Sequence, residues 1–217
     1  MTDYISIYDK AIASLDDPTL TQVYTESKID FCAKMYTHLM RAIWLFNTPY
    51  SETEKLSSSA GKPDYKESYA VGDGVSDIYT ADFDLTGDGT EIIEATVDGR
   101  HAKGVYDKEN KTFIFNEIPA KDSQIVMRGY LTGGFSSNLD QTEETILALL
   151  LVSCWSEKEE NFLLDIRRLL TTSDFKLNDS ASVLRSKVSW HYTMYEQAQK
   201  LMNNYTLNLA KRGFYGR

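Results

Sequence analysis

The sequence predicts an α+β protein, in which a helical body of about four helices is interrupted by an inserted antiparallel β-sandwich-like module. Three observations predict this class. Apolar residues recur at helical spacing towards both ends of the chain, the period changes to two in the middle, and runs rich in Gly, Ser and Asp mark both boundaries. We therefore expect the helical body at 1–50 and 135–217, and the β-module with a flexible lead-in at 51–134.

Composition indicates a folded chain and limits its function. The 217 residues include 42% hydrophobic and 12% aromatic residues, enough to build a packed core. The net charge is -9, and no Lys/Arg run is long enough to follow a phosphate backbone, which argues against sequence-specific DNA binding.

The start of the chain and its hydropathy predict a protein of the cytosol. Residues Met1–Tyr4 lack the basic start and apolar core of a secretory signal. The longest apolar stretch, Ile146–Val152, is too short to span a bilayer. We expect a soluble protein that does not bind a membrane.

Two helices are predicted before residue 50. Tyr4–Leu15 is a short amphipathic pattern that ends before Pro18. Apolar residues then recur at steps of three, four and seven from Tyr24 to Phe46, which predicts one long helix that stops at Asn47-Thr48-Pro49.

The middle of the chain predicts a loop followed by five short strands. Residues 51–77 are rich in Ser, Glu, Lys, Gly and Asp and are interpreted as a loop. Period-two segments separated by turn residues then predict an antiparallel sheet or small sandwich. These segments are Ile78–Leu85, Ile92–Val97, Val105-Tyr106, Thr112–Phe115 and Gln124–Leu131.

A second boundary at Gly133-Gly134 precedes the most apolar helix. Asp140 followed by Glu143 predicts an N-cap with its capping-box partner. Because Ile146–Val152 is apolar on nearly all sides, this helix should be the most buried in the body. A further helix is expected over Glu159–Leu170, with the acids of 157–160 at its N-terminus.

The last helix is predicted to begin at Asn178–Ser180 and to carry a heptad seam. The seam needs a partner, which the sequence leaves open between the first long helix of the same chain and a neighbouring subunit. The residues at four-three spacing are Leu184, Val188, His191, Tyr195, Ala198, Met202, Tyr205 and Leu209. Residues 208–217 are expected to leave the helix as a tail, either frayed or docked on a partner.

No motif predicts catalysis, a cofactor or a metal. The two cysteines, Cys32 and Cys154, are expected to be buried free thiols, with a disulfide as the minor alternative. His38, His101 and His191 have neither metal-pair spacing nor a nearby cysteine. No nucleophile elbow or phosphate-binding loop occurs, and we expect no enzyme activity.

The segment Asp82–Gly89 resembles a calcium loop in part. From Asp84, oxygen-bearing residues stand at positions one, three and five, the last being Asp88, and a glycine stands at six. The twelfth position is Ala95 instead of the bidentate Glu. The segment is therefore interpreted as a hairpin turn between strands, with calcium binding by Asp82, Asp84 and Asp88 left open.

Two sets of short motifs occur in a fixed order along the chain. The set in the helical frame, roughly 1–50 and 135–217, consists of Lys28-Ile29-Asp30, Leu39, Ala42-Ile43, Phe46, Phe135–Leu139, Glu144, Ile146-Leu147, Trp155, Asp174-Phe175-Lys176 and Ser180-Ala181. With these elements the frame resembles the head-to-tail connector (adaptor or neck) proteins of tailed bacteriophages. The set in the β-segment consists of Gly72-Asp73-Gly74, Phe83, Val97-Asp98-Gly99, Tyr106-Asp107, Phe113–Phe115, Pro119 and Tyr130. With these elements the segment is similar to small modules inserted in many virion proteins.

The resemblance implies a homo-oligomeric ring, commonly of twelve subunits, in the phage neck. Such a ring binds the portal protein on one side and a tail or stopper protein on the other, and it lines the channel for DNA ejection. The chain would be made in the host bacterial cytoplasm and located in the virion. The residues assigned to the oligomer or partner interface are Leu184, Val188, His191, Tyr195, Met202, Tyr205, Phe214, Tyr215 and Arg217.

Two other classes remain as alternatives. A surface- or carbohydrate-binding β-module protein is one, and its stacking platform would consist of tyrosines. The tyrosines considered are Tyr65, Tyr69, Tyr79, Tyr106 and Tyr130. An enzyme with an unrecognised site is the other, and a pocket with converging titratable groups would favour it.

Overall fold

The computed structural model describes residues 1–15, 18–46, 52–87, 89–169 and 178–215. Within these ranges, the side chains of 18–19, 52–55, 160, 162–169, 178–187 and 212–215 are not described. The helices are α1 (Tyr4–Ala13), α2 (Pro18–Glu26), α3 (Lys28–Leu45), α4 (Glu52–Ser59), α5 (Gln141–Leu169) and α6 (Asn178–Tyr215). The strands are β1 (Thr2–Asp3), β2 (Asp64–Val71), β3 (Ile78–Thr80), β4 (Glu91–Val97), β5 (Arg100–Ala102), β6 (Gly104–Asp107), β7 (Thr112–Phe115), β8 (Gln124–Leu131) and β9 (Gly134–Phe135).

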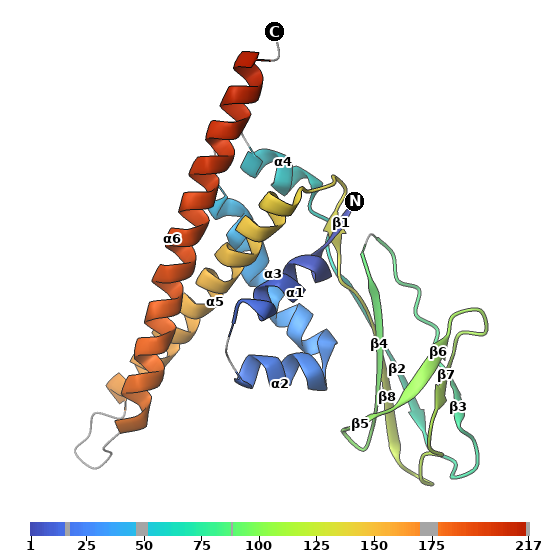
Figure 1. Cartoon of the computed structure of the whole chain (residues 1–217). Helices are drawn as coiled ribbons and strands as arrows, with labels where there is room; N and C mark the ends of the chain where they lie inside the picture. Colours follow the sequence, from blue (N-terminus) through green and yellow to red (C-terminus); the bar gives the residue numbers. More distant parts are fainter. Residues whose placement is uncertain (16–17, 47–51, 88, 170–177, 216–217) are drawn as a thin grey trace. The chain divides into compact units, whose positions relative to one another are not determined.

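The chain is α+β, as the sequence predicts, and it forms two compact units (Figure 1). The first unit comprises Met1–Ile5, Pro18–Cys32 and Ala60–Ser136, and it holds all the described strands. The second comprises Ser6–Asp17, Ala33–Ser59 and Ser137–Arg217 and is helical where described. The predicted boundaries at 1–50, 51–134 and 135–217 stay a prediction.

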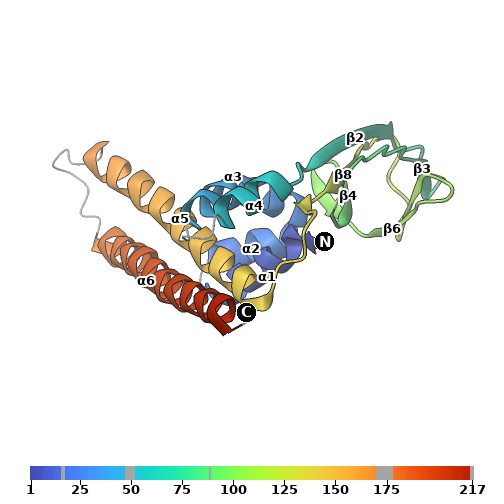
Figure 2. The same cartoon turned by 90° about the horizontal axis from the view of Figure 1, so that it is seen from above.

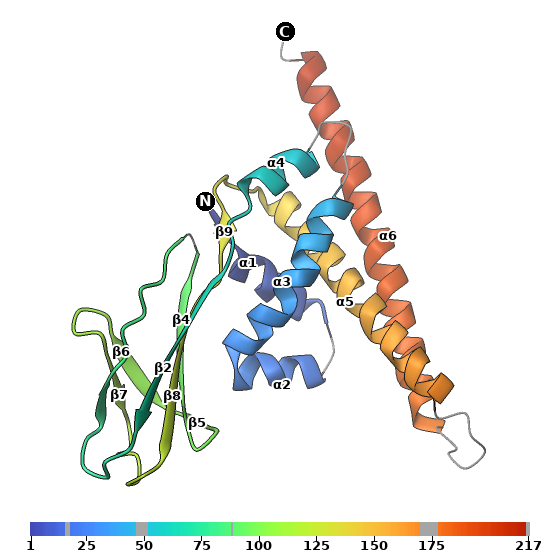
Figure 3. The same cartoon turned by 180° about the vertical axis from the view of Figure 1, so that it is seen from behind.

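Two antiparallel sheets share one core in the first unit. The four-stranded sheet has the order β2-β8-β4-β5 and the three-stranded sheet the order β3-β7-β6 (Figures 1 and 3). β8 lies between β2 and β4 in the larger sheet and pairs with β2 along its whole length and with β4 over Ile125–Leu131. The shared core is built from both sheets and from the segment after β3. Its buried members are Ala81, Phe83, Ala95, Phe113, Phe115, Ile125 and Met127.

Turn chemistry sets the strand connections. Asp98 and Gly99 both have positive φ, 50° and 75°, which fits the two-residue turn that joins β4 to β5. Asp107 closes the β6–β7 turn, because its carboxylate accepts hydrogen bonds from the backbone N–H groups of Glu109 and Asn110. Both turns lie where the sequence predicts a strand boundary.

A polar network joins the start of α3 to the four-stranded sheet. The Ser27 Oγ accepts a hydrogen bond from the Asp30 backbone N–H, which makes Ser27 the N-cap of α3. Glu94 on β4 accepts hydrogen bonds from the Ser27 hydroxyl, at 2.8 Å, and from the Ile29 backbone N–H. Arg128 on β8 lies 2.9 Å from Asp30 and 3.3 Å from Glu94. A carboxylate that is only 8% exposed is therefore neutralised and hydrogen-bonded.

The second unit is organised around α5. Residues 146–152 are all buried, as their apolar run predicts. The predicted capping box is also confirmed: the Asp140 carboxylate accepts from the Thr142 and Glu143 N–H groups, and Glu143 accepts from the Asp140 N–H. α6 runs antiparallel beside α5 (Figure 2).

Six helices are described. The sequence predicts a body of about four helices and outlines five helical ranges, and three local causes account for the change from five to six. The expected long helix is divided at Ser27, because that residue caps α3. α4 and β2 lie within 51–77, which the composition marks as a loop. The helices expected at 140–155 and 159–170 are one helix, α5, so the acids of 157–160 lie in its interior. Glu157 is paired there with Arg41 at 2.7 Å.

The strand prediction also needs correction. β3 ends at Thr80 and lies in a different sheet from β4, so the segment between them is not a hairpin turn. Within this segment, Phe83 packs on β8 so closely that a Cβ at Gly129 would lie 2.7 Å from it. The short strands β5, paired with β4, and β1 and β9, paired with each other, were not predicted.

The C-terminal tail is also corrected, because α6 continues to Tyr215 and includes most of the expected tail. Ala210 and Lys211 are good helix formers, and a single glycine costs only about 1 kcal/mol in a helix. The predicted breaks at residues 16–17 and 47–49 lie outside the described residues.

Replacing Glu94 by alanine should destabilise the first unit by about 2–4 kcal/mol, because Arg128 and the α3 N-terminus lose their buried acceptor. Hydrogen exchange of the β8 amides and urea unfolding followed by circular dichroism measure the effect. Glu91→Ala is the matched control on the same strand. Its partner Lys108 is largely exposed, so less than about 1 kcal/mol should be lost. Equal losses in the two variants would contradict the prediction.

Candidate interaction surface

The predicted heptad seam of α6 packs within the chain. Ala198 and Met202 are buried, and α6 makes its extensive contacts with α5. The main partner of the seam is therefore α5, which the sequence did not name. Tyr205 also reaches Phe46, the last residue of the predicted first long helix, and contact with a neighbouring subunit stays a prediction. Met202 is 3% exposed and has almost no surface left for another subunit.

His191 and Tyr195 lie at the edge of this helix pair. The His191 Nδ1 is 3.0 Å from the Ser153 Oγ and 3.1 Å from the Ser153 carbonyl oxygen. Tyr195 stacks on the His191 ring, with ring centroids 6.4 Å apart and an interplanar angle of 18°. His191 is half-buried and Tyr195 exposed, so only the tyrosine presents substantial surface.

Tyr205 connects α6 to two other helices of the second unit. Its hydroxyl donates a hydrogen bond of 2.8 Å to Glu143, the capping-box residue of α5. Its ring lies 6.2 Å from that of Phe46, which directly follows α3. Tyr205 is thus half-buried by contacts inside the chain, and Val188 is half-buried as well.

The remaining predicted interface residues are only partly described. Leu184, Phe214 and Tyr215 belong to α6, but their side chains lie outside the described residues. Arg217 lies outside the described residues altogether. Their interface roles stay predictions.

Two exposed side chains of α6 were missed by the seam. Tyr192 is 61% exposed and Leu207 is 58% exposed. Tyr192 directly follows the seam position His191, and Leu207 lies two residues after Tyr205. The strict four-three spacing therefore does not include either of them. Tyr192 and Tyr195 are three residues apart and lie on one side of the helix. Large apolar or aromatic residues outside the seam could have indicated from the sequence that this side of the helix is an exposed surface.

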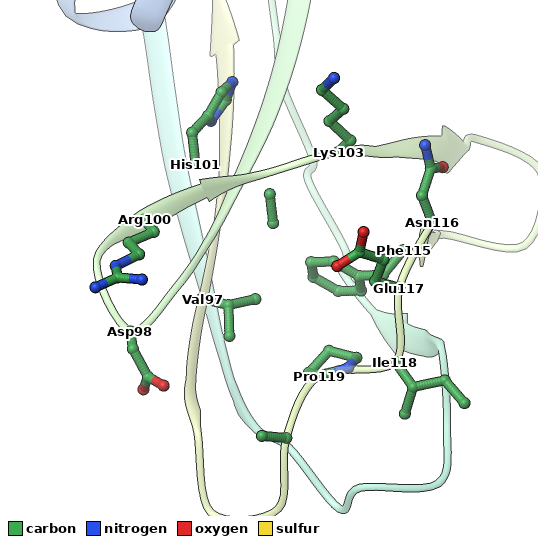
Figure 4. A pocket seen from close by; sticks show the side chains of 12 residues that line it. Val97, Asp98, Arg100, His101, Lys103, Phe115, Asn116, Glu117, Ile118 and Pro119 are labelled. Carbon is green, nitrogen blue, oxygen red and sulfur yellow. The ribbon is translucent and has the colours of Figure 1, made fainter.

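A cavity of about 790 Å³ opens in the β-module between β5 and the segment after β7 (Figure 4). Val97, Phe115 and Pro119 give it apolar walls. Figure 4 shows His101 and Lys103 pointing to the same side, while Arg100 and Asp98 lie at the β4–β5 turn. Glu117 points into the middle of the same view, and none of the other labelled titratable side chains points towards it. The titratable side chains around this cavity therefore do not converge on one point.

The five tyrosines of the carbohydrate alternative do not form one platform. Tyr65 and Tyr69 are exposed on the outward face of β2, and Tyr130 is buried beside Tyr65. Tyr79 and Tyr106 instead pack against the shared core. The platform that was predicted is thus reduced to two exposed rings on one strand.

Glu67 lies between these two rings and binds both of them. The hydroxyls of Tyr65 and Tyr69 donate hydrogen bonds to its carboxylate. These bonds hold the pKa of Glu67 below its usual value. Burial, followed by the bond to Glu67, raises the pKa of Tyr65 to about 12. The strand thus presents two fixed aromatic rings and one charged acceptor.

The partial calcium loop shows no metal-binding arrangement in its described residues. Asp82 pairs with Lys111 at 2.8 Å on the surface. Asp88 lies outside the described residues. Within the part of the chain that the structure describes, no group of three His, Cys, Asp or Glu side chains is placed to hold a metal ion.

Two buried groups in the second unit have strongly shifted pKa values. Burial, with the nearby charges of Lys158, Lys34 and Arg41, lowers the pKa of His38 to about 4. Burial raises the pKa of the Cys154 thiol to about 11. Cys32 and Cys154 are both buried and not disulfide-bonded, as the sequence predicts. Both thiols should be unreactive in the folded protein.

Comparison with protein-family models, with curated proteins and with solved structures finds no match for this chain. Among the described residues, no helix combines the length and the apolar character needed to cross a membrane.

The low pKa of His38 predicts an acid-dependent loss of stability. The unfolded chain binds the proton near pH 6.5 and the folded chain only near pH 4. The contribution of His38 to the free energy of unfolding is therefore fully present above pH 6.5. It falls by about 3 kcal/mol as the pH drops towards 4 and does not change further below that pH. Urea unfolding of the wild type and of His38→Leu at a series of pH values isolates this contribution.

His101→Leu provides the control for that series. His101 is exposed in the first unit, so its replacement should leave the pH dependence unchanged. A wild type and a His38→Leu variant with parallel stability curves between pH 7 and pH 4 would contradict the assignment.

Proposed function

We propose that this chain is a non-catalytic virion structural protein that forms a ring, commonly of twelve copies, in the neck of a tailed bacteriophage. The ring joins the portal protein to a tail or stopper protein and lines the channel for DNA. No cofactor takes part. The observation that carries the proposal is the α5–α6 pair, whose long outer helix keeps Tyr192, Tyr195 and Leu207 exposed.

The shape of α6 suits lateral contacts between subunits. Its 38 residues span about 57 Å, which gives a straight edge for side-by-side packing. Tyrosines are favoured at interfaces because their rings bury a large area and their hydroxyls keep a polar contact. α5 holds the other side of α6, so the exposed side chains are presented on a supported helix.

The charge of the chain supports the channel role. A net charge of -9 gives no long-range attraction for a phosphate backbone. DNA would therefore pass through such a ring without sequence-specific binding. The same charge keeps free subunits soluble before assembly.

Rings should be visible when the purified full chain is imaged by negative-stain electron microscopy and weighed by native mass spectrometry at increasing concentration. Tyr192→Glu and Leu207→Glu each place a carboxylate on the exposed side of α6 and should shift rings to free subunits. Val71→Glu, at an exposed position of the β-module, is the control and should leave the rings intact.

Two outcomes would count against this proposal. A chain that stays monomeric at every concentration and binds no portal assembly is not a connector. If rings still form with both α6 substitutions, α6 is not part of the interface between subunits. Circular dichroism of each variant verifies that the helices are retained.

Tyr65 and Tyr69 favour a second candidate, a surface- or carbohydrate-binding role for the β-module. Aromatic rings stack on the apolar faces of sugars, and a carboxylate such as Glu67 accepts hydrogen bonds from their hydroxyls. Both rings and the acid lie on one exposed sheet face. This role is compatible with a place on the virion surface.

Tyr69→Ala should weaken binding of the chain to bacterial cell-wall polysaccharides at least tenfold if this second role is correct, because half of the aromatic surface is lost. Pull-down with insoluble cell walls and titration with soluble fragments measure it. Val105→Ala, exposed on the other sheet, is the control. Absence of binding by the wild type, or equal binding by both variants, removes this candidate.

A further inference from the structure

The outward face of the three-stranded sheet carries an apolar row that crosses all three strands. Ile78 on β3 stands opposite Ile114 on β7, and Ile114 stands opposite Val105 on β6. Ile78 is 51% exposed and Val105 is 67% exposed. Their neighbours Tyr79, Phe113 and Tyr106 point the other way and pack on the shared core. A solvated sheet face is normally polar at such central positions, so the row is unusual.

Polar residues flank this row with opposite charges on its two sides. Lys103 directly precedes β6 and Asp107 is its last residue, so each is two residues from Val105 along the chain. The Lys103 carbonyl oxygen accepts the Asn116 backbone N–H next to the β6–β7 ladder, which extends the strand alternation to Lys103 and favours the same face for both residues. Lys103 is exposed and forms no ion pair with any described residue. Asp107 is charged at neutral pH, and bonds from the Asn110 side chain and from backbone N–H groups hold its pKa below the usual value.

The uncharged flanking residues continue the same arrangement. Asn116 is bonded through its backbone N–H to the Lys103 carbonyl oxygen and lies beside it. Thr112 stands opposite Asp107 in the ladder. The face thus has Lys103 on one side of an apolar centre and Asp107 on the other, and the lysines of the adjoining turn, Lys108 and Lys111, are paired with Glu91 and Asp82.

We propose that this face pairs with the same face of a second copy of the chain. A two-fold axis along the apolar row, midway between two such sheets, places each residue of the row opposite its own copy. The same rotation exchanges the two sides, so Lys103 of one copy faces Asp107 of the other, and this ion pair forms twice. Contacts of this isologous kind close on themselves and stop at two copies.

The geometry agrees with ordinary sheet packing. The axis reverses the strand direction, so the strands of the two sheets stay aligned, as in sandwiches whose sheets pack about 10 Å apart. Asn116 of one copy then faces Thr112 of the other, and both can exchange hydrogen bonds. Only a small area is buried, so the pair is weak and is best detected by covalent capture.

This inference does not rest on the proposed ring. Neighbours in a single closed ring are related head to tail, whereas the contact described here is two-fold. It therefore joins chains that are not neighbours within one ring, and it uses the β-module alone. Failure of one proposal leaves the other standing.

Val105→Cys in the full chain tests the pairing. Each chain then has one reactive thiol, since Cys32 and Cys154 are buried. Oxidation with copper phenanthroline, or a short bismaleimide, should give covalent dimers and no larger species on a denaturing gel. Val71→Cys, similarly exposed on the other sheet, is the control and should give far fewer dimers.

Charge variants in the Val105→Cys background test the two-fold register. Lys103→Glu places two acids opposite each other and should lower the dimer yield at least fivefold, whereas Lys103→Arg should retain it. Asp107→Asn keeps a side-chain oxygen that can accept the hydrogen bonds of its turn. This variant should give an intermediate dimer yield, and the yield should not decrease when salt is added.

Two results would overturn the inference. The first is a dimer yield no higher than that of the Val71→Cys control. The second is a yield that Lys103→Glu does not change, because the proposed register would then be wrong. Adding Tyr192→Glu should not affect the yield, which separates this contact from the ring.

Discussion

The buried carboxylate of Glu94 is the constraint on which the first unit depends. It accepts the Ile29 N–H and the Ser27 hydroxyl at the start of α3, and it pairs with Arg128 on the adjacent strand. One strand residue therefore satisfies a helix N-terminus that is far away in the sequence. It also fixes the position of the break between α2 and α3, because Ser27 serves both the cap and the carboxylate. The start of α3 therefore covers the outward face of β4 and β8 around Arg128, whereas the outward face of β2 is exposed.

Local chemistry explains which elements the sequence could predict. The capping box at Asp140, the apolar run 146–152 and the turn at Asp98-Gly99 each contain their own cause within a few residues, and all three are found. β2 was missed because it is rich in polar and charged residues and gains its ladder from β8, about sixty residues later. Asp82–Gly89 has the composition of a hairpin turn, but the strands before and after it lie in different sheets, and Phe83 within it packs on β8. Tertiary contacts decided both cases.

The candidate surface on α6 could be located from sequence only in part. The four-three spacing correctly marks a packed side, and Ala198 and Met202 are buried on it. Such spacing cannot tell a partner in the same chain from one in another chain, since both bury the same side chains. The contacts with α5 decide this point, and the exposed side of α6 then becomes the surface of interest. Tyr192 and Leu207 can be assigned to an exposed surface only when α5 is known to cover the opposite side of α6.

The two sheets of the β-module present unlike surfaces for the same reason. In the larger sheet, outward residues are covered or polar near Arg128, and the exposed tyrosines of β2 are tied to Glu67. In the smaller sheet, Ile78, Ile114 and Val105 come from three separate strands, and each looks unremarkable in its own segment. Only the register of β3, β7 and β6 assembles them into one row. Lys103 and Asp107 are equally far from Val105 along the chain. A two-fold axis along the row therefore brings Lys103 of one copy opposite Asp107 of the other.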